Sequence, residues 1–156
     1  ITGYGAGNQL TQRGTATFTY DNNGNLTNDG TNSYTWDARN QLASMSGPGL
    51  AATFQYDGSG RRVGKTINSV STNYLYDGEN IVQELAGTTP SANLLSGGVD
   101  RILTRTDGTG TRMPLTDIQG STLALVDDAG TLQTQYNYDP FGNTITSGQS
   151  NANSSK

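Results

Sequence analysis

The stretch FQYDGSGRRV at residues 54–63 decides the fold, because its pattern recurs along the chain. The pattern is an aromatic residue, any residue, a second aromatic residue and then an aspartate. It occurs five times, as Phe18-Thr19-Tyr20-Asp21, Tyr34-Thr35-Trp36-Asp37, Phe54-Gln55-Tyr56-Asp57, Tyr74-Leu75-Tyr76-Asp77 and Tyr136-Asn137-Tyr138-Asp139. The second aromatic stands at positions 36, 56 and 76 in three successive copies, a period of 20 residues. Repetition at this period predicts a chain of stacked supersecondary units.

Each aromatic pair predicts a β-strand with one covered face. Residues i and i+2 share a face on a strand, whereas they diverge on a helix. We expect neighbouring strands to align these rings against one another, since cross-strand aromatic pairs contribute up to about 1 kcal/mol each. The ten aromatics expected to stabilise the sheet are Phe18, Tyr20, Tyr34, Trp36, Phe54, Tyr56, Tyr74, Tyr76, Tyr136 and Tyr138.

The aspartate after each pair predicts a tight turn, in which its carboxylate accepts backbone N–H groups. Four residues after the second aromatic stands Gly, Asn or Asp, the residues that best tolerate positive φ. The expected turn residues are Asp21 with Gly24, Asp37 with Asn40, Asp57 with Gly60, Asp77 with Asn80, Asp117 with Gly120, and Asp139 with Gly142; the same phase includes Asp100. An apolar residue then returns, so each unit predicts a β-hairpin.

The fold class is therefore all-β, a repetitive antiparallel hairpin sheet that is part of a shell or stays an open, solenoid-like sheet. Residues 1–13 are expected to be an irregular or partial repeat, residues 14–148 about seven repeat units, and residues 149–156 a polar flexible tail. The aromatics lapse between 85 and 116, but residues 101–105 alternate polar with apolar and predict a strand of the same sheet. Only 31% of residues are hydrophobic, which favours a thin sheet over a thick core.

Composition excludes several kinds of chemistry. The chain has no Cys and no His, which removes disulfides, Cys/His zinc sites and imidazole catalysis. Its net charge of −4, with nine basic residues, gives no electrostatic footprint for nucleic acid. No apolar run approaches the length of a membrane-spanning helix. We therefore expect no cofactor, no nucleic-acid partner and no membrane insertion.

Some acidic residues are candidates for a calcium site or a catalytic acid–base pair, but neither kind of site is needed to explain them. The stretches 21–25 and 127–130 offer clustered oxygens, but a calcium ion needs six to eight, and turn formation accounts for the same residues. Glu79 and Glu84 lie five residues apart and form no distinct acid–base pair. The sequence therefore predicts no metal-binding or catalytic residue, and the chain is not expected to be an enzyme.

Several motifs resemble the YD (tyrosine–aspartate) repeat of RHS proteins. They are YDNNGNLT at 20–27, WDARNQL at 36–42, YDGSGRRV at 56–63 and YLYDGENIVQEL at 74–85. Two more, LTDIQGSTLALVD at 115–127 and YNYDPFGN at 136–143, resemble the segment that leads into the RHS-associated core. The resemblance implies a β-ribbon wound into a hollow shell, which encloses a carboxy-terminal toxin in bacteria and occurs in animal teneurins.

The resemblance also implies a self-cleaving aspartyl protease site made of paired Asp-Pro-x-Gly-Leu motifs. Here Asp139-Pro140-Phe141-Gly142 is followed by Asn143 rather than Leu, and no second copy follows. We therefore do not expect cleavage activity in this chain.

Three functions stay open. The first is a non-catalytic structural segment of a large exported RHS-type protein, secreted or on a bacterial surface, forming shell wall or displayed scaffold. Its partners would be further repeats of the parent chain, other copies of itself and an encapsulated toxin domain. The second is a self-assembling extracellular filament, since open β edges can pair head to tail. The third, a carbohydrate-binding surface module, rests on the aromatic content.

Overall fold

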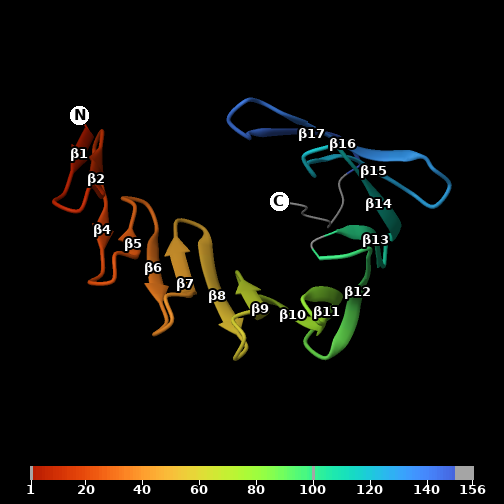
Figure 1. The fold of residues 1–156 in the computed structure, drawn as a ribbon, viewed down its shortest axis with the longest axis horizontal. Helices are drawn as coiled ribbons and strands as arrows, with labels where there is room; N and C mark the ends of the chain where they lie inside the picture. The colour runs from red at the N-terminus through yellow and green to blue at the C-terminus, as the bar shows by residue number, and fades with distance from the viewer. Residues whose placement is uncertain (1, 100, 150–156) are drawn as a thin grey trace. The chain divides into compact units, whose positions relative to one another are not determined.

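The computed structural model describes residues 2–99 and 101–149, and within them the chain forms β-strands and no helix (Figure 1). The strands are β1 (Thr2–Tyr4), β2 (Leu10–Arg13), β3 (Ala16–Thr17), β4 (Thr19–Tyr20), β5 (Leu26–Asn28), β6 (Ser33–Trp36), β7 (Leu42–Gly47), β8 (Leu50–Tyr56), β9 (Arg62–Ile67), β10 (Val70–Asp77), β11 (Asn80–Ala86), β12 (Thr89–Ser96), β13 (Ile102–Asp107), β14 (Gly110–Thr116), β15 (Thr122–Val126), β16 (Leu132–Tyr138) and β17 (Thr144–Gly148).

The strands pair in the order in which they occur along the chain. β1 to β3 form a three-stranded sheet, and β4 to β17 form a 14-stranded sheet in which each strand is hydrogen-bonded to its sequence neighbours. The pairings are antiparallel. The all-β class and the repeated hairpin are thus confirmed, and β13 confirms the strand predicted at 101–105 within the same sheet.

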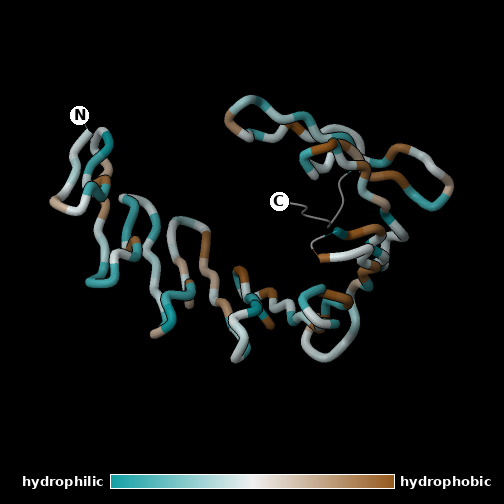
Figure 2. Tube along the Cα trace, viewed as in Figure 1, coloured by the Kyte–Doolittle hydropathy of each residue, from teal (hydrophilic) through white to brown (hydrophobic). Residues whose placement is uncertain are grey.

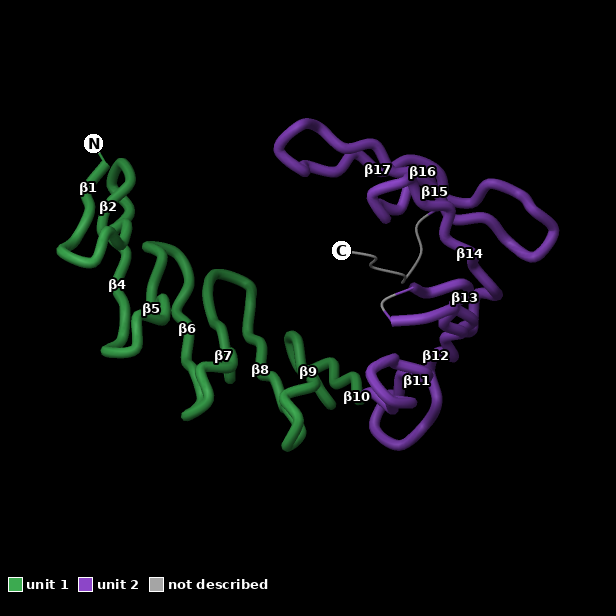
Figure 3. The backbone as a smooth tube through the Cα atoms, in the orientation of Figure 1, with its two compact units in different colours: residues 1–73 green, residues 74–156 purple. Residues whose placement is uncertain are grey.

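The chain divides into two units, residues 1–73 and residues 74–156 (Figure 3). Each unit is a single layer of sheet with little enclosed core. Few hydrophobic residues are buried, and most of them are alanines. They are Ala52 in the first unit, and Ala92, Ala124, Leu125 and Tyr136 in the second. This small number of covered apolar residues agrees with the low apolar content of the sequence.

The two faces of the first unit differ in chemistry. Opposite one another on five successive strands stand five hydroxyl residues, Thr35, Ser44, Thr53, Thr66 and Ser71. Within this row Thr35 and Ser44 hydrogen-bond through their side chains at 2.6 Å, as do Thr66 and Ser71 at 2.8 Å. Because side chains alternate along a strand, the aromatic pairs lie on the other face. Figure 2 colours the same trace by hydropathy.

Candidate functional site

A tight turn that begins at an aspartate recurs along the structure with the same hydrogen bonds, and we call it the aspartate turn. In the turn at 57–61 the backbone N–H of Asp57 donates to the carbonyl of Arg61 at 2.9 Å, and that of Gly60 donates to the carbonyl of Asp57 at 3.1 Å. Asp57 Oδ1 accepts the backbone N–H groups of Ser59 and Arg61 at 2.9 and 3.0 Å. One carboxylate oxygen therefore satisfies two turn amides, while Gly60 holds φ at 87°.

The same four bonds form at six aspartates, with carboxylate distances of 2.8–3.0 Å. These aspartates are Asp21, Asp37, Asp57, Asp117, Asp127 and Asp139. The residue three positions after each has positive φ, namely Gly24, Asn40, Gly60, Gly120, Gly130 and Gly142. A carboxylate and a residue suited to the left-handed region thus define one local structure wherever they occur at this spacing.

Two further turns keep the backbone bonds without the aspartate. Gly5 donates its N–H to the carbonyl of Gln9 at 2.8 Å, and Asn8 has a φ of 57°. Gly97 likewise donates to the carbonyl of Arg101 at 2.8 Å. Both glycines occupy the aspartate position. A repeat turn therefore forms inside residues 1–13, and one of its backbone bonds is kept where the aromatics lapse. Asp100, expected in the latter turn, lies outside the described residues.

The structure corrects the turn expected at 77–80. Asp77 is the last residue of β10 and Asn80 the first of β11, and the positive φ of 58° belongs to Gly78. A glycine at the first position of a two-residue loop favours the shortest hairpin, and here the chain reverses over Gly78 and Glu79. Neither Asp77 nor Asn80 therefore has its expected place in a longer turn.

Asp127 forms a turn that sequence reasoning assigned only as a weak calcium candidate. It follows Leu125-Val126, with no aromatic before it, and its Oδ1 accepts the N–H groups of Ala129 and Thr131. The signal was present in the spacing of Asp127, Gly130 and Leu132, which matches the other turns. Asp127 has no aromatic pair before it and does not fit the 20-residue period that identified Asp117.

Hydrogen bonds hold the carboxylates of Asp29, Asp37 and Asp57 in their charged form. The backbone N–H of Gln41 lowers the pKa of Asp37, and the side chain of Arg61 lowers that of Asp57. In the turn between β5 and β6, the N–H of Asn32 and the hydroxyl of Tyr34 hold the pKa of Asp29 far below its usual range. Carboxylates engaged in this way serve the backbone and are poor proton donors near neutral pH.

The aspartate of the Asp-Pro-Phe-Gly segment is engaged in the same manner. Asp139 accepts the N–H groups of Phe141 and Asn143, and its Oδ2 accepts the side-chain amide of Asn143 at 2.6 Å. Across residues 2–99 and 101–149, no three acidic side chains gather to hold a metal ion. Among the same residues, no helix is long and apolar enough to span a membrane.

The second aromatic of a pair anchors its repeat to the one before. Tyr20 donates its hydroxyl to the carbonyl of Leu10 at 2.8 Å, and Trp36 donates its indole N–H to the carbonyl of Leu26 at 2.8 Å. Tyr56 reaches Leu42 at 3.1 Å, and Tyr138 reaches Thr122 at 2.7 Å. Each acceptor is the first residue of a strand that follows a turn, five positions after Gly5, Asp21, Asp37 and Asp117 respectively.

Sequence reasoning missed this bond, although a signal for it was present. The first aromatic of a pair is Phe or Tyr, whereas the second is always Tyr or Trp, which carry a polar group. A position that needs both an apolar ring and a hydrogen-bond donor admits these two residues.

The predicted pairing of aromatics across neighbouring strands is wrong. In the described pairings, Tyr34 stands opposite Met45, Phe54 opposite Lys65, and Tyr136 opposite Thr146. The aromatic pairs occur on every second strand in the repeat, and the strands between carry none. The Phe54 ring contacts a cation, since the guanidinium carbon of Arg62 lies 5.3 Å from the centre of the ring.

In the first unit, side-chain amides connect one aspartate turn to the next. Asn25 donates to the side chain of Asn40 at 2.9 Å, and Gln41 donates to the carbonyl of Gly60 at 3.1 Å. The amide nitrogen of Gln9 lies beside Gly24, at 3.4 Å from where a Cβ would stand. In all three cases the residue after the positive-φ position contacts the positive-φ residue of the following turn, which fixes the spacing of the turns.

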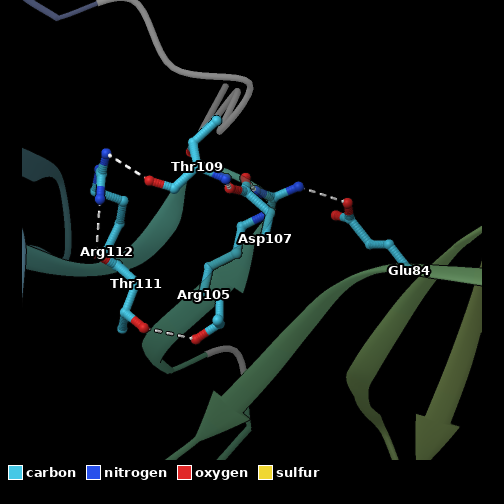
Figure 4. Close-up of polar contacts among 7 residues, drawn as sticks. Glu84, Arg105, Asp107, Thr109, Thr111 and Arg112 are labelled. Atoms are coloured by element: carbon cyan, nitrogen blue, oxygen red, sulfur yellow. Dashed lines mark hydrogen bonds and ion pairs between the residues drawn. The ribbon is translucent and has the colours of Figure 1, made fainter.

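The second unit contains a buried ion cluster on strands β11 and β13 (Figure 4). Arg105, 9% exposed, donates to Glu84 at 2.8 Å and also contacts the carboxylate of Asp107. Burial raises the pKa of Asp107, but hydrogen bonds from Thr109 and Arg105 outweigh it and lower the pKa overall. Between Glu84 and Asp107, in register with both, stands Ala92, whose small side chain leaves room for the guanidinium.

The chain was compared with known proteins. The family model described as teneurin YD-shell matches residues 2–154. The tRNA3(Ser)-specific nuclease WapA of Bacillus spizizenii and the tRNA nuclease WapA of Bacillus subtilis (strain 168) are each 34% identical over 142 residues. These matches cover 87% of this chain, which spans 6% of the length of either relative.

Solved structures share the fold. The crystal structure of TcdB2-TccC3 without its hypervariable C-terminal region matches 96% of this chain with a TM-score of 0.53 and 16% identity, over 10% of its own length. The TcdB2-TccC3-TEV crystal structure matches 92% of this chain with a TM-score of 0.52 and 16% identity, again over 10% of its length. Since the family model matches almost every residue, the chain belongs to the teneurin YD-shell family.

Proposed function

We propose that this chain is a non-catalytic wall segment of a shell, within a much longer bacterial protein of the RHS type that is exported and encloses a toxin domain. The observation that carries the proposal is the bond from the second aromatic of a pair to a carbonyl of the preceding repeat. Such a bond exists only between neighbours, so it serves the continuity of a ribbon and not a local pocket.

The chemistry of the turns supports a non-catalytic role. The carboxylates of the six turn aspartates accept hydrogen bonds from backbone amides. In the ion cluster, Arg105 is paired with Glu84 and Asp107. The relatives are named tRNA nucleases, and this chain corresponds to 6% of their length. We therefore place any nuclease or other toxin activity of the parent protein outside these 156 residues.

Cryo-electron microscopy of the intact parent polypeptide tests the proposal. We expect hollow particles in which residues 2–149 trace part of the wall, with density for the toxin domain inside. An open sheet, or fibres assembled from many copies, would overturn the wall function; fibres would support the filament instead. Intact mass of the same sample shows whether the particles contain the full-length chain.

A further inference from the structure

The second unit exposes apolar side chains where the first unit exposes polar ones. We call these residues the apolar strip; they are Leu95, Leu115 and Ile145 on strands, and Val99, Ile118 and Phe141 on the aspartate and glycine turns next to them. Their exposure runs from 50% at Leu115 to complete exposure at Ile118. Large apolar residues gathered on one region of a soluble protein mark a contact surface.

Strand register places the strand residues of the strip on one face. Leu115 stands opposite Ala124, which stands opposite Gln135 on the next strand. Asn137, two residues further along, stands opposite Ile145. Because alternate residues share a face, Leu115 and Ile145 lie on the same side.

Leu95 joins them through two further strands. Leu95 stands opposite Thr104 on β13, and Thr106 on the same strand stands opposite Thr111 on β14. Leu115 lies four residues after Thr111, so it is on the same face. The turns that carry Val99, Ile118 and Phe141 follow β12, β14 and β16 and therefore lie at one end of the antiparallel strands. The strand residues of the strip thus share one face of the sheet, and its turn residues lie at one end of the strands.

This face carries no charge at the positions just traced. The charged residues of these strands, Glu84, Arg105, Asp107 and Arg112, are linked by register to the opposite face, where Asp107 aligns with Ala92 and Arg105 with Arg112. A neutral, apolar strip does not suit nucleic acid or a charged lipid surface. It suits a neutral protein surface.

The same positions in the first unit show that the ribbon itself does not need the strip. Two residues before the aspartate, where the second unit has Leu115, the first unit has Thr19, Thr35 and Gln55. Thr19 and Thr35 hydrogen-bond to hydroxyls on the neighbouring strand at 2.8 and 2.6 Å. The hairpin forms with either chemistry, so the apolar residues have another use.

We propose that the apolar strip docks against a further stretch of YD repeats of the same parent chain, a contact that rests on the proposed wall function. The turn residues of the strip recur every two strands, about 10 Å apart, which is the spacing that another stretch of the same hairpins presents. The relatives are far longer than this chain, so most of their length lies outside it. Such a stretch is tethered to the strip and so present at high effective concentration.

Site-specific photo-crosslinking in the intact parent protein tests the contact. The photoreactive p-benzoylphenylalanine replaces Phe141 in one variant and Leu115 in another. Controls carry it at Ser59 and at Gln55, which hold the matching positions in the first unit. Phe141 and Ser59 each donate a backbone N–H to their turn aspartate, so the backbone of the turn is the same in both.

We expect crosslinks from positions 141 and 115 to YD-repeat peptides outside residues 1–156, and none of these from positions 59 and 55. Crosslinks to the toxin domain, to a separate protein or to a second copy of the chain would overturn the proposal. Particles that are hollow by electron microscopy but give no crosslink overturn the contact alone. Particles that are not hollow overturn the wall function. In that case the crosslinked peptides still show whether the strip contacts other YD repeats.

Replacing Ile118 and Phe141 by Asn gives a second measurement. Asn22 and Asn23 already occupy the matching places in the turn at 21–25, so the substituted turns still form. We expect hydrogen exchange to become faster in the docked repeats while exchange in the turns at 117–121 and 139–143 stays as before. Unchanged exchange throughout the parent protein would count against the docking surface.

Discussion

The hydroxyl of Tyr138 lies 2.7 Å from the backbone carbonyl oxygen of Thr122, the first residue of β15, which follows the aspartate turn at 117–121. The same relationship joins Tyr20 to Leu10, Trp36 to Leu26 and Tyr56 to Leu42. A repeat is therefore tied to its predecessor by a side-chain bond in addition to the sheet ladder. The tyrosine of the YD repeat therefore donates a hydrogen bond to the preceding repeat.

Tyr20→Phe should lower the free energy of unfolding by about 1 kcal/mol, because the ring stays and the carbonyl of Leu10 loses its hydrogen-bond donor. Urea denaturation of the purified chain measures the effect. Tyr4→Phe is the matched control, since Tyr4 is 64% exposed and removal of its hydroxyl should change stability little. Equal losses in the two variants would contradict the anchoring role.

Asp37→Ala should destabilise the chain more than Asp37→Asn does. Alanine leaves the N–H groups of Arg39 and Gln41 without the carboxylate oxygen that accepts them at 2.8 and 2.9 Å, whereas the Asn side chain keeps one oxygen acceptor in place. The urea midpoints of the two variants give the ranking. Should the two substitutions have equal effects, charge rather than hydrogen bonding would define the turn.

Much of the fold could be predicted from sequence because the local rules are strict. An aromatic pair fixes which strand face is covered, and an Asp followed at the right spacing by Gly or Asn fixes the turn. These two rules located the turns at 21, 37, 57, 117 and 139. They failed at Asp77, where Gly78 allows a shorter reversal. They also overlooked Asp127, which has no aromatic before it and does not fit the 20-residue period that identified Asp117.

The contacts between repeats could not be read from a single sequence. Tyr20 reaches the carbonyl of Leu10 on β2, a strand of the other sheet, and no local pattern in the sequence indicates this contact. The ion cluster joins Glu84 and Arg105 across a full strand, and only the register reveals that Ala92 lies between them. The expected aromatic ladder failed for the same reason, since alternate strands carry no aromatic residue.

Gly120→Ala should cost about 1 kcal/mol, because φ is +88° and L-residues with a Cβ are strained there. A Cβ at this position meets no atom within 4 Å, so the loss isolates backbone strain from crowding. Gly120→Asn should cost less, as Asn40 already holds the equivalent place with a φ of 60°. Thermal unfolding of both variants checks the order, and a larger loss for Asn would contradict it.

Arg105→Met should destabilise the second unit by about 2–3 kcal/mol, below the 3–5 typical of a fully buried pair, because Glu84 retains some solvent. The substitution keeps the apolar stem but leaves Glu84 and Asp107 without a cation. The double variant Arg105→Met with Glu84→Gln should recover part of the loss. A double-mutant cycle in urea measures the coupling, and strict additivity would show that the two residues act independently.

Stability should fall when the pH is lowered below about 4, and the sign follows from the turn aspartates. Five of them have pKa values that are lowered from the usual 3.8 in the folded chain, namely Asp21, Asp37, Asp57, Asp127 and Asp139. The largest cause is the side chain of Asn25 at Asp21 and the N–H of Gln41 at Asp37. Between the folded and unfolded pKa values the unfolded chain binds more protons, so unfolding is favoured by acid. The contribution of these groups is complete above the unfolded value and is lost as pH falls through the folded one.

Urea midpoints at pH 7 and pH 3 measure this change, and Asp37→Asn isolates its source. The variant removes one titrating carboxylate while leaving every other charge in place, so the difference in midpoint between the two pH values should shrink. General repulsion among the nine basic residues at low pH affects both proteins alike and cancels in the comparison. If the variant and the parent sequence lose the same stability between pH 7 and pH 3, the carboxylate of Asp37 is not linked to folding.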